Sequence, residues 1–185
     1  GLGDVYKRQI SYLSGIPVLL VTAWGTLVQI YRANVNWEAP ARFLVLAVFG
    51  WSIGVIPAIV DGTMTVNKVM HNTLWVPGHF HFYLLLGMLP MLLGFMLHVS
   101  RDPGNRFHPL LERGVFWLFT GSAVAFVFMF LYSGLHSIPR RFAEHLPAWV
   151  GQAQLATLFG TLVLLSLATF FILLLRRLPR VRMQA

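Results

Sequence analysis

Residues 69–100 read VMHNTLWVPGHFHFYLLLGMLPMLLGFMLHVS and contain no Asp, Glu, Lys or Arg. A helix needs about 20 apolar residues to cross the hydrocarbon core of a bilayer, so this stretch is long enough for one span. A core helix of a soluble protein would instead show a single apolar stripe and a polar outer face. The stretch therefore predicts a transmembrane helix.

Four more charge-free stretches occur, at residues 9–31, 43–60, 114–139 and 146–175. From the five stretches we predict an all-α, polytopic membrane helix bundle. Its five transmembrane helices are expected at about residues 10–31, 43–61, 73–99, 114–135 and 152–175. Residues 1–9 are polar and charged, unlike the sequence that follows, and are expected to be a non-native lead. Residues 10–185 then form one membrane domain.

The composition excludes several classes of protein. The chain has 185 residues, of which 57% are hydrophobic and 11% are charged, and its formal net charge is +8. Soluble domains carry about 25% charged residues, and disordered chains are poor in hydrophobic residues, so both classes are excluded. The absence of cysteine excludes disulfides and thiolate metal sites. The basic residues lie between apolar stretches and form no basic domain, so no nucleic acid partner is expected.

The loop charges predict how the chain is oriented in the membrane. With five spans, segments 32–42, 101–113 and 176–182 fall on one side, and together they hold nine Arg. The other side holds Lys68, Arg140 and Arg141. Because cytoplasmic loops carry the excess of Lys and Arg, we expect an integral membrane protein with a cytoplasmic C-terminus. The first span then starts outside without a signal peptide, which leads us to expect earlier helices.

Two histidines near the start of the third span, His79 and His81, are the main candidates for a functional site, because ionisable groups inside a membrane are costly. Residues two apart on a helix lie about 200° apart around its axis and about 3 Å apart along it. The two rings therefore face opposite sides and do not readily chelate one ion. Each could instead bind a separate large cofactor such as haem, whose iron takes an axial His. The alternative is that both rings are hydrogen-bonded to neighbouring helices.

A second cluster, SIPRRF at residues 137–142, follows the fourth span on the same predicted side as the start of the third span. Arg140 and Arg141 run against the charge rule there. The planar guanidinium of Arg suits carboxylates, and haem carries two propionates, so the pair would suit haems whose propionates face outward. The alternative is an interfacial Arg pair bound to lipid headgroups.

These two motifs carry a family resemblance. HNTLWVPGHFH at residues 71–81, followed one helix later by PRR at residues 139–141, resembles subunit I of the haem–copper oxygen reductases, the cytochrome c oxidases. The wording HNT-x-WVPGHFH is more similar to the B-type branch than to the A-type branch. The resemblance runs from about residue 11 to the C-terminal end and corresponds to the last five of the twelve core helices. The chain is therefore expected to be a C-terminal fragment of a twelve-helix subunit.

The resemblance implies roles for the residues of the first motif. His79 would be the axial ligand of a high-spin haem, where dioxygen binds, and is the catalytic candidate. His81 would be one axial ligand of a low-spin haem, which relays electrons. His71 and Asn72 would lie near the haem propionates.

The resemblance further implies that Arg140 and Arg141 pair with the propionates of the two haems. The implied reaction of the complete enzyme is reduction of dioxygen to water with electrons from cytochrome c, coupled to proton translocation. The implied partners are copper, subunit II with cytochrome c, the N-terminal helices of the same subunit and membrane lipid. The implied location is the inner membrane of a prokaryotic cell.

Some features of the family are missing from this sequence. The three His ligands of copper and the second ligand of the low-spin haem lie on earlier helices of the family, so this chain is expected to supply haem ligands only and to be inactive alone. Asn67 stands where many members have an acid. Residues 18–21, which follow Pro17, lack the Thr, Ser or Lys of a proton path. The usual route of proton uptake is therefore not predicted.

Two other functions remain open on the sequence. The first is a nitric-oxide-reducing member of the same superfamily, in which a non-haem iron site replaces copper. The second is a haem-free transporter or structural membrane bundle, in which His79 and His81 only pack between helices. The spans hold no charged pair at mid-membrane, which disfavours a transporter.

Overall fold

The structure, a computed structural model, describes residues 10, 15–100, 109–142 and 144–177. The lead predicted at residues 1–9 lies outside this part. The described elements are α2 (Gly15–Ala33), α3 (Ala39–Ile53), α4 (Val55–Gly62), α5 (Met64–Met70), α6 (Trp75–Tyr83), the π-helix η1 (Leu84–Met88), α7 (Leu89–Val99), α8 (Pro109–Leu135), the 3-10 turn η2 (Pro147–Trp149) and α9 (Val150–Arg177).

The described elements combine into five helices long and apolar enough to cross a membrane. These run over Gly15–Ala33, Ala39–Gly62, Trp75–Val99, Pro109–Leu135 and Pro147–Arg176. The prediction of an all-α bundle with five spans is confirmed. A membrane imposes this outcome, because each span must satisfy its backbone hydrogen bonds internally.

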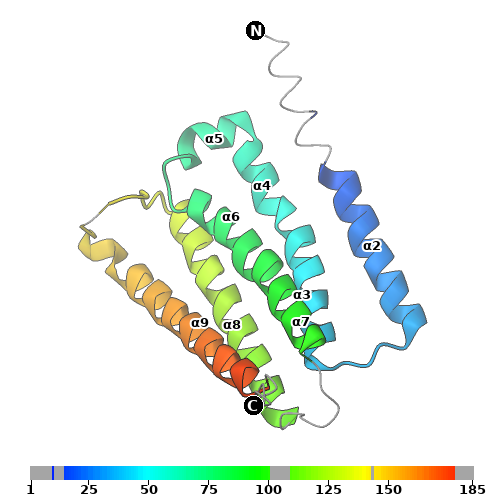
Figure 1. Cartoon of the computed structure of the whole chain (residues 1–185). Coiled ribbons are helices and arrows are strands. Elements are labelled where there is room, and N and C mark those ends of the chain that lie inside the picture. Colours follow the sequence, from blue (N-terminus) through cyan, green and yellow to red (C-terminus); the bar gives the residue numbers. More distant parts are fainter. Residues whose placement is uncertain (1–9, 11–14, 101–108, 143, 178–185) are drawn as a thin grey trace, which may run out of the picture.

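The third span, α6–η1–α7, packs between α3 and α8, with α9 beyond α8 and α2 beyond α3 (Figure 1). The α2–α3 connection and the ends of α7 and α9 lie at one end of the bundle, which we call the α2–α3 end (Figure 1). The end of α5, the start of α6 and the end of α8 lie at the other, which we call the α5–α6 end. Both sequence motifs therefore lie at the α5–α6 end.

The core forms where α3, α8 and α9 meet. Phe43 and Phe119 are each 1% exposed. The ring centroid of Phe43 lies 5.0 Å from that of Phe116, 5.9 Å from that of Phe119 and 6.0 Å from that of Phe170. Each such aromatic pair adds about 0.5–1.5 kcal/mol beyond the burial of its area. These contacts hold three helices together as a frame for the third span.

The third span is irregular in its middle. Pro90 has no N–H, so the carbonyl of Leu86 loses the donor that a regular helix would supply four residues later. The chain forms the π-helix η1 at this point, and the amide of Leu89 donates to the carbonyl of Leu84. The Leu86 carbonyl lies against Gly50 of α3, where a Cβ atom would collide with it. Pro90 and Gly50 together therefore allow α3 and the third span to approach closely.

The fourth helix starts earlier along the chain than the charge-free stretch does. α8 begins at Pro109 and includes Arg113. Proline is favoured in the first turn of a helix, where its missing N–H is not needed. Glu112 in the same turn interacts favourably with the positive end of the helix dipole. Arg113 is thus placed on a helix at the edge of the membrane rather than in a loop.

Candidate functional site

The two sequence motifs pair through their backbones. The Leu74 amide donates to the carbonyl of Ile138 at 2.9 Å, and the Arg140 amide donates to the carbonyl of Asn72 at 2.9 Å. These bonds flank an isolated antiparallel bridge between the two segments. The segment before α6 and the loop after α8 are therefore joined, although 66 residues separate Leu74 from Arg140 in sequence.

The loop after α8 turns sharply to reach this bridge. Ser137 and Arg141 have φ angles of 59° and 67°, a region that residues other than glycine rarely adopt. Gly134 near the end of α8 lies against the backbone of Trp75, where a side chain would collide. The absence of a side chain at Gly134 lets α8 approach the start of α6.

The start of α6 is anchored by side chains as well. The Thr73 hydroxyl donates to the carbonyl of Met70 at 2.8 Å and accepts from the Trp75 amide at 3.2 Å. The Trp75 indole N–H donates to the carbonyl of Pro57 in α4 at 3.3 Å. The first turn of α6, which positions the two candidate histidines, is therefore held from α4 as well as from α8.

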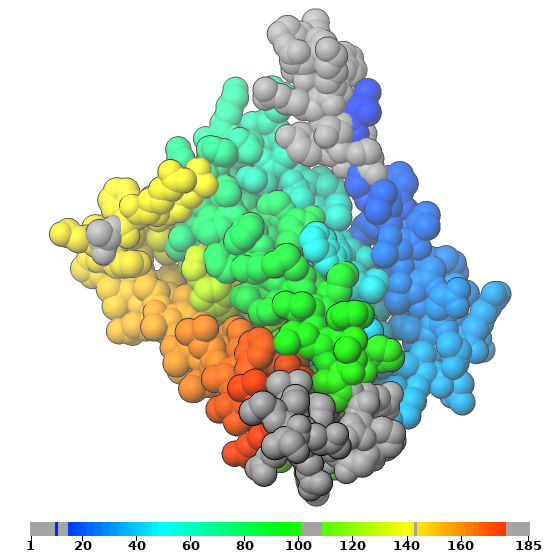
Figure 2. All heavy atoms as spheres, in the orientation of Figure 1, coloured from blue at the N-terminus to red at the C-terminus, as the bar shows by residue number. Residues whose placement is uncertain are grey.

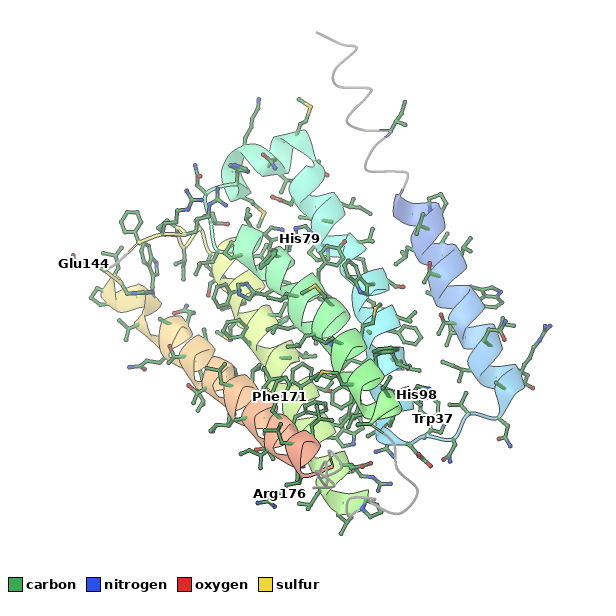
Figure 3. The ribbon with its side chains drawn as sticks, in the orientation of Figure 1. Trp37, His79, His98, Glu144, Phe171 and Arg176 are labelled. Atoms are coloured by element: carbon green, nitrogen blue, oxygen red, sulfur yellow. The ribbon has the colours of Figure 1, made fainter. Side chains whose placement is uncertain are left out.

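His79 presents a nitrogen with no partner. Its Nε2 atom is buried and has no hydrogen bond to any residue that the structure describes. Its ring contacts that of Tyr83, at a centroid distance of 5.1 Å, and Tyr83 in turn contacts Trp51 of α3 at 5.2 Å. Buried polar atoms without a partner are rare in folded proteins. A ring nitrogen in this state is suited to bind a metal atom. Figure 3 labels His79 near the start of the third span.

His81 has one nitrogen engaged by the backbone. Its Nδ1 lies 2.6 Å from the carbonyl oxygen of Pro77. Because a carbonyl only accepts, Nδ1 carries the proton in this bond, and Nε2 keeps its lone pair. Metal-binding histidines are held in this way in many proteins, since the second hydrogen bond fixes both the tautomer and the ring orientation. The arrangement therefore fits an axial ligand of haem.

The two histidines have different neighbours. The His79 ring contacts Tyr83 on its own helix, and Tyr83 contacts Trp51 of α3, whereas the ring of His81 lies 5.5 Å from Phe126 and 5.4 Å from Phe130 of α8. The expected divergence of the two rings is therefore observed. Among the residues that the structure describes, no group of three His, Cys, Asp or Glu side chains could hold a metal ion.

The remaining predicted residues lie at the bridge. His71 and Asn72 are exposed, Arg140 is half-buried and Arg141 is exposed. The backbone bond between Asn72 and Arg140 places the two motifs next to one another at the α5–α6 end. Cations and polar groups from two spans are thus brought to one boundary of the membrane.

A family model described as "Cytochrome C and Quinol oxidase polypeptide I" matches residues 4–171. The chain belongs to this family. It is 25% identical to cytochrome c oxidase subunit 1 of Pecten maximus over 168 residues, which are 89% of this chain and 35% of that protein. It is 26% identical to a probable quinol oxidase subunit 1 of Staphylococcus aureus (strain USA300) over 166 residues, or 88% of this chain and 24% of that protein.

The fold is also similar to that of a solved oxidase-family structure. A cryo-EM structure of a heme-copper terminal oxidase dimer covers 95% of this chain with a TM-score of 0.70 and 22% identity, and the chain spans 37% of that protein. This cytochrome c and quinol oxidase family chain thus spans about a quarter to a third of the relatives that it matches. The relatives do not distinguish the B-type branch from the A-type branch, so that assignment stays a prediction.

Two features of this oxidase-family chain were not expected from the sequence. Asp61, to which no role was given, has a buried Oδ1 atom without a partner among the described residues. Asn67, which stands where many members of the family have an acid, donates from Nδ2 to the Asp61 backbone carbonyl at 2.6 Å. The backbone of an acidic residue six positions earlier in the chain therefore lies beside Asn67. Only the fold of α4 and α5 reveals this.

The second unexpected feature is a cavity of about 430 Å³ between α8 and α9. Phe126 and Phe130 line it, and the same two rings contact His81. His145 and Trp149, at the start of the last span, also line it. The cavity is mostly apolar and its volume is within the range of small-molecule and cofactor sites.

Proposed function

We propose that this chain is the haem-binding C-terminal part of subunit I of a respiratory terminal oxidase, in which His79 and His81 each bind a different haem. The observation that carries this proposal is the state of the two rings. His79 has a buried Nε2 without a partner among the described residues, and His81 has Nδ1 held by a carbonyl with Nε2 left to bind. The His81 ring contacts α8, whereas the His79 ring contacts Tyr83, which in turn contacts α3, and this difference supports two separate haems.

In this proposal His79 would bind the iron of the high-spin haem, and His81 would bind the iron of the low-spin haem. The two haems, with copper in the complete subunit, would supply the electron transfer and the dioxygen reduction. The residues of this chain would orient the ligands. The Pro77 carbonyl fixes the orientation of the His81 ring, and Phe126 and Phe130 exclude water from the face of that ring which they contact. The third span would then supply a ligand to each haem.

The basic and polar residues of the bridge bind the propionates. Arg140 and Arg141 supply positive charge, and the backbone bond to Asn72 positions Arg140 next to the start of α6. His71 and Asn72 are exposed at the same place and are available to a propionate or to a water molecule. We propose that this whole cluster binds the propionates of the haems. We also propose that the complete subunit belongs to the B-type branch of the family.

The open face of the third span is consistent with missing neighbours. Phe80 is 60% exposed and Phe95 is 59% exposed, and much of α6 and α7 is uncovered in the space-filling view (Figure 2). The complete subunit would cover this face with haem and with its N-terminal helices. This part alone is therefore proposed to be inactive.

The activity is tested on the complete, purified enzyme. We expect it to consume dioxygen when supplied with reduced cytochrome c, and to release protons on the side opposite to the C-terminus. Oxygen electrodes and a pH dye in proteoliposomes measure both. Rapid turnover with a quinol but none with cytochrome c would contradict the proposed donor, and turnover with nitric oxide but not dioxygen would contradict the proposed substrate.

The propionate role is tested through the haem potentials. We expect Arg140→Ala to lower a haem midpoint potential by about 30–60 mV, because a cation near the propionates favours the electron-rich reduced form, and 59 mV is tenfold for one electron. Spectroelectrochemical titration of the complete enzyme measures it. Arg32→Ala, at the other end of the bundle, is the control and should leave the potential unchanged. An unaltered potential in Arg140→Ala would refute the pairing.

A further inference from the structure

Two neighbouring cavities lie between α3 and α8, the first of them at the α2–α3 end. The first has a volume of about 620 Å³ and the second of about 280 Å³, and both are lined by Leu46 and Phe49 of α3. Phe82 and Leu86 of the third span line the second cavity from below. We call the two cavities together the α3–α8 groove.

The groove lies opposite the open face of the third span. Phe82, in its floor, is two residues from Phe80, so the two side chains lie about 200° apart around the helix. Phe80 is on the open face. The groove starts at the α2–α3 end, whereas His79 and His81 lie near the α5–α6 end, so a group bound at the start of the groove is distinct from the groups of the candidate functional site (Figure 1).

The mouth of the groove is cationic and lies at a membrane boundary. Among the described residues that line the first cavity, the charged ones are Arg42 and Arg113. Trp37 and Trp117 line it too and are 47% and 61% exposed (Figure 3 shows Trp37 at this end). Tryptophan is enriched where headgroups meet the hydrocarbon, and Arg binds phosphate oxygens with two parallel hydrogen bonds. The mouth therefore matches a phosphate group at headgroup depth.

Below the mouth, the residues that line the groove are almost all apolar. Apart from the arginines and the tryptophans, the described lining residues are apolar except for Thr120. The Oγ1 atom of Thr120 is buried and has no hydrogen-bond partner among the described residues. Glu38 and Glu112 are neighbours of the arginines in sequence but do not line this cavity among the residues described. The groove thus combines an anion-binding end with an apolar interior, which is the chemistry of a phospholipid.

The walls favour a lipid chain over a helix. From Arg113 to Leu131, α8 rises by about 27 Å along the groove, so an acyl chain that starts from a phosphate at the mouth stays within a hydrocarbon core of about 30 Å. A helix has a diameter of about 10–12 Å and packs in membranes against small residues. The walls here are largely bulky, as at Phe49 and Phe128, which disfavours a packed helix.

We propose that the α3–α8 groove binds one anionic phospholipid, with its phosphate on Arg42 and Arg113 and an acyl chain along Leu46 and Phe49. The site lies on the described part of this chain and does not depend on the haem assignments. The lipid would fill the space between α3 and α8 on the face of the bundle opposite to the open face of the third span.

The test counts bound lipid on the complete enzyme. The enzyme is washed in mild detergent, incubated with mixed micelles of equimolar phosphatidylglycerol and phosphatidylcholine, and analysed by native mass spectrometry. The unmodified enzyme should retain one phosphatidylglycerol that the double variant Arg42→Gln/Arg113→Gln loses, with occupancy falling about tenfold or more because two charge-assisted contacts are removed. Arg32→Gln, whose side chain is exposed at the same end but off the groove, should retain it.

A second variant separates the site from a folding defect. Val45→Trp leaves both arginines in place but fills the first cavity, and it should also lose the retained phosphatidylglycerol while the haem spectrum stays normal. Retention of phosphatidylglycerol in either groove variant would overturn the proposal. Equal retention of phosphatidylcholine would also overturn it. A cross-link from Trp117→Cys to another subunit, in place of lipid, would overturn it too, because the groove would then be a helix-docking surface.

Discussion

Replacing His81 with Ala in the complete subunit is expected to abolish the low-spin haem spectrum and to leave the carbon-monoxide-sensitive spectrum of the high-spin haem in place. Ala offers no nitrogen to the iron, and no neighbour replaces the ring that is held by the Pro77 carbonyl and contacts Phe126 and Phe130. Reduced-minus-oxidised spectra of membranes that contain the variant measure the loss.

A matched control exists on the same chain. His136 also has its Nδ1 close to the carbonyl four residues earlier, at 2.9 Å from Tyr132, but it is exposed at the end of α8. His136→Ala should leave both haem spectra normal. In His81→Gly, added imidazole should restore part of the low-spin signal by occupying the vacated space. A low-spin band of normal intensity in His81→Ala would contradict the assignment of His81 as a ligand of the low-spin haem.

Replacing His79 with Ala is expected to have the opposite spectral effect. The carbon-monoxide-sensitive signal should disappear while the low-spin haem is retained, because the His81 ring and its contacts with Phe126 and Phe130 are unchanged. Dioxygen consumption should fall by more than about 100-fold, since even the loss of a group behind a metal ligand costs about 10–100-fold. The oxygen electrode and the carbon monoxide difference spectrum measure the two effects.

The control for His79 is His98, which is exposed in the last turn of α7 on the same span. His98→Ala should leave both carbon monoxide binding and turnover unchanged. If His79→Ala bound carbon monoxide normally and still reduced dioxygen, the buried Nε2 would have to be explained by packing alone.

The membrane spans were predictable because a bilayer selects on a simple property. A charge-free stretch of about 20 residues has few alternatives to a helix when no water is present to satisfy its backbone. The irregular middle of the third span was not predicted. Pro90 marks the place, but the approach of the Leu86 carbonyl to Gly50 depends on how α3 packs, and no local pattern encodes that contact.

The candidate site was predictable to a similar degree. The divergence of His79 and His81 follows from helix geometry alone. For the two motifs, the sequence predicted only that they lie on the same side of the membrane, and it did not predict that their backbones pair. The hydrogen bonds that join Leu74 to Ile138 and Arg140 to Asn72 connect segments far apart in sequence. The position of Asp61 beside Asn67 likewise depends on tertiary structure.

The cavity beside His81 is a further case. His145 and Trp149 carry no sequence pattern that marks them as part of a site, yet they line the same space as Phe126 and Phe130. Their contribution depends on the packing of α9 against α8, where Phe126 approaches Gly160.

The central claim is that His79 and His81 bind two different haems. A reduced-minus-oxidised optical spectrum of the complete subunit in membranes, recorded with and without carbon monoxide, tests it most directly. The account predicts a low-spin haem signal that carbon monoxide leaves unchanged and a high-spin signal that carbon monoxide shifts. A folded, full-length protein without any haem signal would contradict it.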